Sequence, residues 1–204
     1  MLRAVVLWLA VIPSVARDLH AQQPPVVLEA LPGSTLTIRG STSVGAPWHC
    51  VASDVTARVA VVPQSADSAA LPDVRGIALH VPVSSLKCQS GLMERQMRKT
   101  IRADVDTAAQ HISGRFDIQD ETKPPKENQR FLYGPIMVAG TERNIFFNVT
   151  VDRVDDGTLH ARSRVPLALT DFGMVPPRVL FGIVRARDAV IVEVDLRYRD
   201  RASH

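Results

Sequence analysis

The chain has 204 residues, of which 24 are Lys or Arg, 21 are Asp or Glu and 5% are aromatic. A net charge of only +3, with acidic and basic residues interspersed, argues against a nucleic-acid-binding protein. The scarcity of aromatic residues also leaves few platforms on which bases could stack. After removal of the N-terminal segment described next, about 180 residues remain, which fits one domain with a sizeable core.

Residues 1–21 have the pattern of a signal peptide. Arg3 provides a positive start, the apolar run 4–15 is too short to span a bilayer, and Ala21 is a small residue at a plausible cleavage point. An uncleaved N-terminal anchor is the alternative. Every later apolar run is interrupted by Arg, Asp or Glu. We therefore expect a mature domain over residues 22–204 without a transmembrane segment, in the periplasm or secreted.

Two cysteines, Cys50 and Cys88, lie in the predicted mature chain. In an oxidising compartment a single pair is more often a disulfide than a metal site. The bond would close a loop of about 39 residues and stabilise the fold by roughly 3–4 kcal/mol in the chain-entropy model. Two free buried thiols are the alternative. Because His49 has no partner at metal-ligand spacing, we expect no metal site and no cofactor.

Apolar residues at every second position predict β-strands from residue 34 onward. In the segment 34–39, Leu36 and Ile38 fall on one face. One long strand is expected over residues 51–61, with its odd-numbered residues sharing a face. After a predicted loop rich in Ser, Ala, Asp and Pro, residues 77–83 alternate in the same way.

A single helix interrupts the β pattern. Ser90 is a suitable N-cap for a helix over residues 91–101. The apolar side chains share one stripe, and the charged residues Glu94, Arg95 and Arg98 lie opposite. The stripe comprises Leu92, Met93, Met97 and Ile101. Such a stripe is compatible either with core packing or with a lid that faces a ligand.

Strand patterns resume after the helix. Apolar residues alternate over residues 112–118, 145–151 and 159–169. The charged, proline-containing segment 121–129 is predicted to be a surface loop. Asp155-Asp156-Gly157 is a strong hairpin signal before the last of these strands.

The C-terminal region predicts one more hairpin, centred on Arg187-Asp188, with strands over residues 181–186 and 190–198. Eight or so strands with one apolar face each indicate an all-β barrel or sandwich. Strand length favours an antiparallel barrel, which also leaves no unpaired edges.

Several segments together resemble the YceI-like family of lipid- or polyisoprenoid-binding proteins. The similar segments are residues 34–43, 48–50, 81–86, 91–97, 134–141, 167–177, 180–182 and 187–192. The most specific of them is Leu167–Pro177, and together they span nearly the whole predicted mature chain. Many family members carry a His-Ser pair near the start of the domain and an Asn after the helical Met. This chain has neither.

The resemblance implies an antiparallel eight-stranded, lipocalin-like barrel with one short helix at its mouth and a hydrophobic tunnel that holds an isoprenoid chain. Mostly aliphatic inward residues are compatible with such a tunnel, although they could also fill the barrel. From alternation and resemblance together, we expect a fixed set of side chains to line the tunnel. The expected residues are Leu79, Val81, Met93, Met97, Phe116, Phe147, Leu167, Phe172 and Phe181.

The favoured function is therefore a binding protein for an isoprenoid-type lipid or quinone, as a monomer or homodimer. The alternative is a ligand-free structural or protein-interaction module of the cell envelope. An enzyme is not expected, because no convergent polar residues, nucleophile motif or phosphate loop is present. Asp171-Phe172-Gly173 matches a kinase triplet only by coincidence, and we expect Gly173 to permit a bend there.

Overall fold

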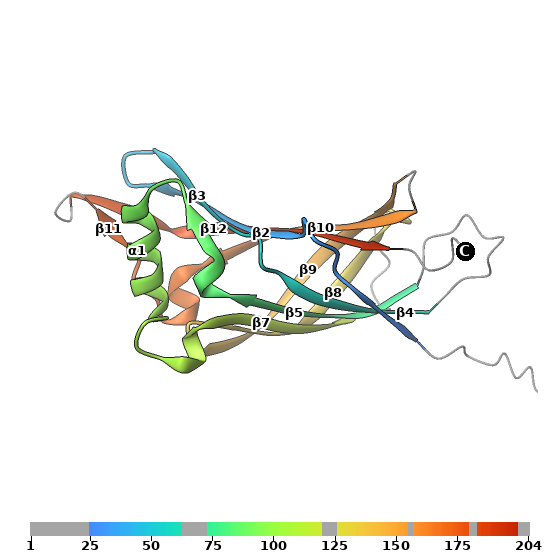
Figure 1. Ribbon diagram of the computed structural model, residues 1–204. Helices are drawn as coiled ribbons and strands as arrows, with labels where there is room; N and C mark the ends of the chain where they lie inside the picture. The colour runs from blue at the N-terminus through green and yellow to red at the C-terminus, as the bar shows by residue number, and fades with distance from the viewer. Residues whose placement is uncertain (1–24, 63–72, 120–125, 155–156, 180–182, 200–204) are drawn as a thin grey trace, which may run out of the picture.

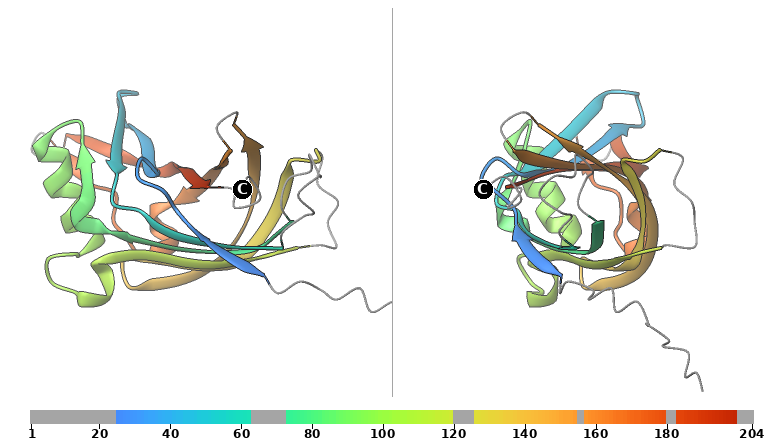
Figure 2. Two further views of the ribbon diagram at one scale, coloured as in Figure 1. Left: turned by 45° about the vertical axis from the view of Figure 1, so that its right-hand side comes forward. Right: turned by 90° about the vertical axis from the view of Figure 1, so that its right-hand side faces the viewer.

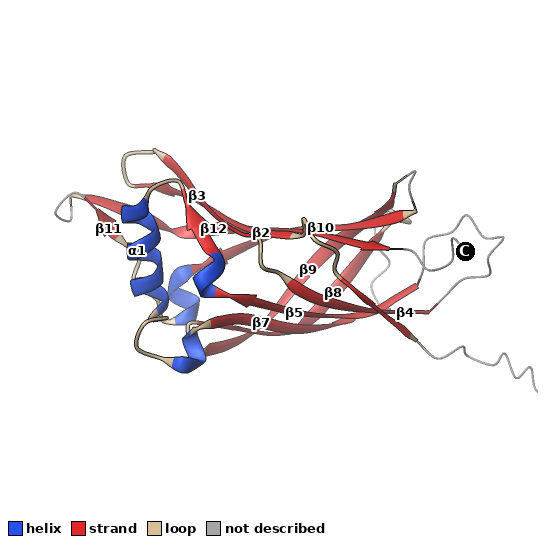
Figure 3. Cartoon of the chain, viewed as in Figure 1, coloured by secondary structure: helices blue, strands red, loops and turns tan. Residues whose placement is uncertain are grey.

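The computed structural model describes residues 25–62, 73–119, 126–154, 157–179 and 183–199. These residues form a mostly β protein with one α-helix, α1 (Gly91–Ile101) (Figures 1 and 3). The strands are β1 (Val26–Glu29), β2 (Thr35–Thr42), β3 (Pro47–Ala52), β4 (Thr56–Val62), β5 (Asp73–Pro82), β6 (Leu86–Cys88), β7 (His111–Ile118), β8 (Gln129–Val138), β9 (Thr141–Arg153), β10 (Thr158–Ala168), β11 (Arg178–Val179) and β12 (Val184–Arg199). Three short 3-10 helices are η1 (Val83–Ser85), η2 (Thr107–Ala109) and η3 (Leu169–Phe172).

Eleven antiparallel strands follow one another in a single curled sheet. Their order is β1-β4-β5-β7-β8-β9-β10-β12-β2-β3-β6, and β11 pairs with β12 beside this path. Seen along its length, the sheet wraps around its inner face as a half-barrel (Figure 2). The predicted eight-stranded closed barrel is wrong, since β1 and β6 end the path instead of pairing with each other. A closed sheet was expected because it leaves no edges, whereas here both end strands are only three or four residues long, which also limits edge exposure.

The long strand predicted over residues 51–61 is two strands. The chain leaves β3 after Ala52, near one end of the strand order, and re-enters the sheet near the other end as β4 at Thr56. Three residues connect them, which moves the alternation by one position. Cys50 and Ala52 are therefore buried in β3 instead of Val51, while the predicted inward residues of β4 are buried.

The predicted C-terminal hairpin is also wrong, because β12 runs without a turn through Arg187 and Asp188. The register against β2 shifts between Ala186 and Val190, so the supposed turn residues form a bulge. The Asp188 carboxylate accepts hydrogen bonds from the Thr170 N–H (2.9 Å) and hydroxyl (2.7 Å) in η3. Asp188, a residue type common in turns, thus attaches the bulge to η3.

The predicted helix and its cap are confirmed. The Ser90 hydroxyl accepts a hydrogen bond from the Met93 N–H (3.2 Å), and Met97 is buried with Met93 beneath the helix. Leu92, predicted on the same stripe, is exposed instead. The helix lies at one end of the sheet against β6 and β11 (Figure 1). No helix among the described residues is long and apolar enough to cross a membrane.

The structure joins Cys50 of β3 to Cys88 of β6 in a disulfide. The two cysteines are direct cross-strand partners. The bond therefore attaches the three-residue edge strand β6, and with it the start of α1, to the sheet. The predicted division into residues 1–21 and 22–204 stays a prediction.

Candidate functional site: an apolar cavity in the curled sheet

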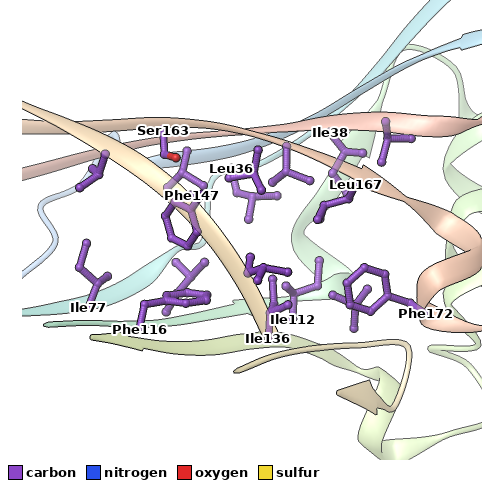
Figure 4. A pocket seen from close by; sticks show the side chains of 18 of the residues that line it. Leu36, Ile38, Ile77, Ile112, Phe116, Ile136, Phe147, Ser163, Leu167 and Phe172 are labelled. Carbon is purple, nitrogen blue, oxygen red and sulfur yellow. The ribbon is translucent and has the colours of Figure 1, made fainter. Parts of the chain in front are cut away.

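A narrow cavity lies between the inner faces of seven strands, with Phe172 of η3 at one end (Figure 4). Its lining consists of Leu36, Ile38, Ile77, Leu79, Ile112, Phe116, Ile136, Val138, Ile145, Phe147, Val149, Ala161, Ser163, Val165, Leu167, Ala168, Leu169, Phe172, Met174, Val190, Val192, Val194 and Leu196. Every lining residue except Ser163 is aliphatic, aromatic or Met. The site therefore offers dispersion contacts and the exclusion of water, with very little polar recognition.

The aliphatic character follows from strand alternation combined with register. Leu36 of β2 lies opposite Val194 of β12, and Ile38 lies opposite Val192. Val192 in turn lies opposite Val165 of β10 on its other side. Since the inward positions of neighbouring strands coincide, alternation within each strand produces a continuous apolar surface across the sheet.

Two phenylalanines narrow the cavity at the end away from Phe172. Phe116 and Phe147 meet edge to face with ring centroids 4.9 Å apart, and Figure 4 shows them pointing towards each other. The Phe116 ring lies over Gly114, where an added Cβ would come within 2.5 Å of the ring. Gly114 thus lets the ring lie flat against β7 instead of extending further into the cavity.

Ser163 stands where strands β9 and β10 separate. The two strands pair only from Leu159 opposite Arg153 to Ser163 opposite Val149. Beyond this point, residues 141–148 of β9 and residues 164–168 of β10 have no backbone pairing with each other. The Ser163 hydroxyl donates a hydrogen bond to the Asn148 carbonyl (2.7 Å), so it satisfies the first unpaired carbonyl and is not directed at a ligand.

The cavity has a volume of about 80 Å³. A water-sized site needs at least about 10–15 Å³ on this measure, so the cavity holds roughly five to eight such sites. A methyl or methylene group occupies about the same volume as one water molecule, roughly 30 Å³. The free space therefore suits a short length of unbranched or methyl-branched chain and excludes a ring system unless side chains move.

The structure brings five of the nine predicted tunnel residues to the cavity: Leu79, Phe116, Phe147, Leu167 and Phe172. Val81 of β5 and Met93 and Met97 of α1 are buried but do not line it. Phe181 lies outside the described residues. Whether any of these side chains contacts a ligand stays a prediction.

Several lining residues were missed, although the alternation pattern contained the signal for them. Leu36 and Ile38 were assigned to one strand face, and Val192 and Val194 share a face of the last strand. A single-strand pattern shows which residues share a face but not which strands face the same hollow. That information resides in the strand order, which brings β2 next to β12.

Among the described residues, the cavity lining contains no titratable side chain. No group of three or more His, Cys, Asp or Glu side chains there is placed to hold a metal ion. The buried hydroxyl of Tyr198 has no hydrogen-bond partner among the described residues and lies outside the cavity lining. Burial raises the pKa of Tyr198, so the phenol stays neutral.

Comparison with known proteins identifies the fold. No protein-family model matches the chain, and no match is found among curated proteins. Among solved structures, Burkholderia cenocepacia BcnA is similar with a TM-score of 0.60 and 15% identity, over 80% of this chain and 95% of that one. A polyisoprenoid binding domain from Saccharophagus degradans, described as implicated in plant cell wall breakdown, matches with a TM-score of 0.60 and 10% identity, over 86% and 99%.

The Campylobacter jejuni YCEI protein matches with a TM-score of 0.52 and 12% identity, over 72% of this chain and 82% of that one. The structural neighbours are thus YceI-like proteins, which confirms the resemblance noted in the sequence. At these identities the likeness establishes a YceI-like fold.

Proposed function

We propose that the protein binds one long apolar chain, of the isoprenoid lipid or quinone class, in the cavity of the curled sheet and performs no chemistry on it. The observation that carries this proposal is the lining, in which the single hydroxyl is already hydrogen-bonded to the backbone. A site of this composition gains binding energy from burying apolar surface, at roughly 25 cal/mol per Å² before ordering costs.

The likeness to a polyisoprenoid binding domain supports the same ligand class. We further propose that the chain is a distant member of the YceI-like family and that it acts in the periplasm or after secretion. The signal-peptide pattern of residues 1–21 supports that location.

The narrowness of the cavity favours a flexible chain over a compact ligand. A chain longer than the present free volume must widen the cavity. In the wall formed by residues 141–148 of β9 and residues 164–168 of β10, the two segments have no backbone pairing with each other. Widening the gap therefore breaks no hydrogen bonds between β9 and β10, while the segments keep their pairing with β8 and β12. Phe147 and Leu167 lie along this wall and line the cavity. We assign ligand entry to this gap between β9 and β10.

A second function is favoured by the same small volume. If Phe116 and Phe147 keep their edge-to-face contact, the interior is largely filled. The protein would then be a ligand-free structural or protein-interaction module. The two functions differ in whether the protein carries lipid, which can be measured directly.

The test is native mass spectrometry of the protein isolated without detergent, with organic extraction of the same sample. We expect a mass above that of the chain alone and a discrete long-chain lipid in the extract. Ala161→Leu places three more carbon atoms in the cavity and should abolish retention, whereas the matched Ala189→Leu change, at an exposed position of β12, should not. Equal retention in both variants, or a lipid-free protein even after incubation with quinones and polyprenyl lipids, would contradict the proposal.

A further inference from the structure

The end of the molecule that carries α1 exposes aliphatic side chains on separate loops. Val44 lies in the β2–β3 turn, Val105 in the turn after α1, Val175 before β11 and Ile183 before β12; their exposed fractions are 71%, 80%, 72% and 80%. Leu92 on α1 is 42% exposed. Single exposed aliphatic residues are ordinary, but several at neighbouring loop tips indicate an interaction surface.

Hydrogen bonds and packing bring these loops together. The Ser43 N–H donates to the Arg185 carbonyl (2.7 Å), and the Arg185 N–H donates to the Ser43 hydroxyl (3.3 Å), so the β2–β3 turn lies beside the start of β12. The helix α1 packs against β11, and the Val105 N–H donates to the Arg102 carbonyl at its C-terminal end (3.1 Å). Figures 1 and 2 show the β2–β3 turn, α1 and β11 at the same end of the sheet. We call these loops, together with α1 and the strand ends beside them, the α1 end. It comprises residues 43–46, 87–108, 169–179 and 183–188.

The α1 end carries more positive than negative charge. It contains eight Lys and Arg residues against five Asp and Glu residues. Four of the five acids are engaged within the fold. Glu94 pairs with Lys87, Asp104 pairs with Arg98, Asp106 accepts the Ala108 N–H, and Asp188 accepts both donors of Thr170.

Five of the basic side chains at the α1 end are exposed and form no ion pair within the described chain. They are Arg95, Lys99, Arg102, Arg178 and Arg185. The positive surplus of this end is therefore directed at solvent, among the exposed aliphatic side chains.

We propose that the α1 end docks onto the surface of an anionic phospholipid bilayer. Aliphatic side chains on separate loops can enter the boundary between head groups and acyl chains, while surrounding Arg and Lys side chains contact lipid phosphates. A single-stranded nucleic acid would need stacking side chains, which these aliphatic tips do not provide, and a duplex would gain nothing from the tips. The combination of aliphatic tips and unpaired cations is the one that an anionic lipid surface complements.

Docking in this orientation would place one end of the cavity next to the bilayer. Met174 lines the cavity, and the next residue, Val175, belongs to the docking surface. Phe172 of η3, in the same segment of the α1 end, also lines the cavity. The docking proposal does not require the cavity to hold a ligand, so the two proposals can fail separately.

The experiment is co-sedimentation of the protein with vesicles of phosphatidylcholine containing phosphatidylglycerol, and with vesicles of phosphatidylcholine alone. Wild-type protein and all variants carry the same N-terminus, so the apolar segment 4–15 cannot cause a difference between them. We expect binding to the anionic vesicles that weakens at high salt. Val105→Asp combined with Ile183→Asp should weaken it by at least about tenfold.

The charge requirement is tested by Arg95→Glu combined with Lys99→Glu, which should also weaken binding by at least about tenfold. The matched control is Val154→Asp, an exposed aliphatic residue directly after β9 and outside the α1 end; it should bind like wild type. Wild-type protein that ignores anionic vesicles, or double variants that bind as wild type does, would overturn the proposal. So would a dimer in solution that the Val105→Asp and Ile183→Asp pair dissociates without any vesicle binding. Lipid retention, measured on the same samples, reports on the cavity independently.

Discussion

The two faces of strands β2, β12 and β10 differ sharply, although they are built from alternate residues of the same segments. On the inner face, Leu36 of β2 meets Val194 of β12 in the cavity wall. On the outer face, Arg39 of β2 pairs with Glu193 of β12 at 2.6 Å, and Arg164 of β10 approaches the same carboxylate at 3.9 Å. These ionic side chains remain a third or more exposed.

The residues of the inner face and those of the outer face therefore contribute differently to stability. Inner residues are buried and gain free energy from burial and packing, so their replacement is costly. Outer ion pairs in water contribute little each, because screening and side-chain entropy offset most of the attraction. The inner face should therefore determine stability and ligand capacity, and the outer face should mainly keep the sheet solvated.

The largest effect should come from Leu36→Ala, since Leu36 is 1% exposed and lines the cavity. We expect the free energy of unfolding to fall by about 2–5 kcal/mol, measured by urea denaturation. The adjacent Thr37→Ala, on the outer face, should cost less than about 1 kcal/mol. Equal losses at the two positions would show that the faces do not differ energetically as the structure implies.

Removal of the disulfide should rank next. The double variant Cys50→Ala and Cys88→Ala releases β6 and opens a loop with a sequence separation of 38. We expect a loss of about 2–4 kcal/mol in thermal or urea unfolding, and the same loss when the wild-type bond is reduced. If neither treatment changes the unfolding midpoint, the backbone pairing of β6 with β3 is sufficient to hold the edge strand without the disulfide.

The turn between β8 and β9 belongs to neither face. Two substitutions there should change the free energy of unfolding by smaller amounts, one raising it and the other lowering it. Ala139 and Gly140 both have positive φ, 52° and 72°, as a two-residue hairpin turn requires. Ala139→Asn should raise the free energy of unfolding by about 0.5–1 kcal/mol, because Asn tolerates this conformation better than Ala. Gly140→Ala should lower it, since its Cβ would also lie 3.3 Å from the Asp106 carboxylate. A destabilised Ala139→Asn variant would contradict this assignment of the turn.

The smallest effect should come from an outer ion pair and should depend on pH. The hydrogen bond from Arg162, followed by that from Asn128, lowers the pKa of Asp152. Because the folded-state pKa lies below the unfolded value, the stabilisation is present above the unfolded pKa and is lost as the pH falls through the folded one. Asp152 is partly exposed, so Asp152→Asn should cost only a few tenths of a kcal/mol at neutral pH.

Comparing the unfolding midpoints of wild type and Asp152→Asn across this acidic range checks the sign. The difference between the two proteins should shrink as the pH is lowered. A difference that grows in acid would show that another group is responsible.

Much of the local structure could be predicted from the chain. The helix and its Ser90 cap depend on residues within one helical turn of each other. The alternating faces of β2 and β5 likewise depend only on residues close together in the sequence. Most of the cavity lining lies on strand faces that follow from the same alternation. The errors share a cause: the break after Ala52 and the bulge at Arg187-Asp188 depend on what lies beside the strand, and no local pattern records that.

By itself the sequence determined where the helix and most of the strands lie and which side of most elements is apolar, because period-2 and period-3.6 patterns act over a few residues. Only the tertiary structure decided that the sheet stays open at β1 and β6, that β9 and β10 separate at Ser163, and which apolar residues surround a cavity instead of filling a core. These features depend on strand order and register between segments distant in sequence. The free energy that selects them comes from packing of the whole inner face, to which each segment contributes only a part.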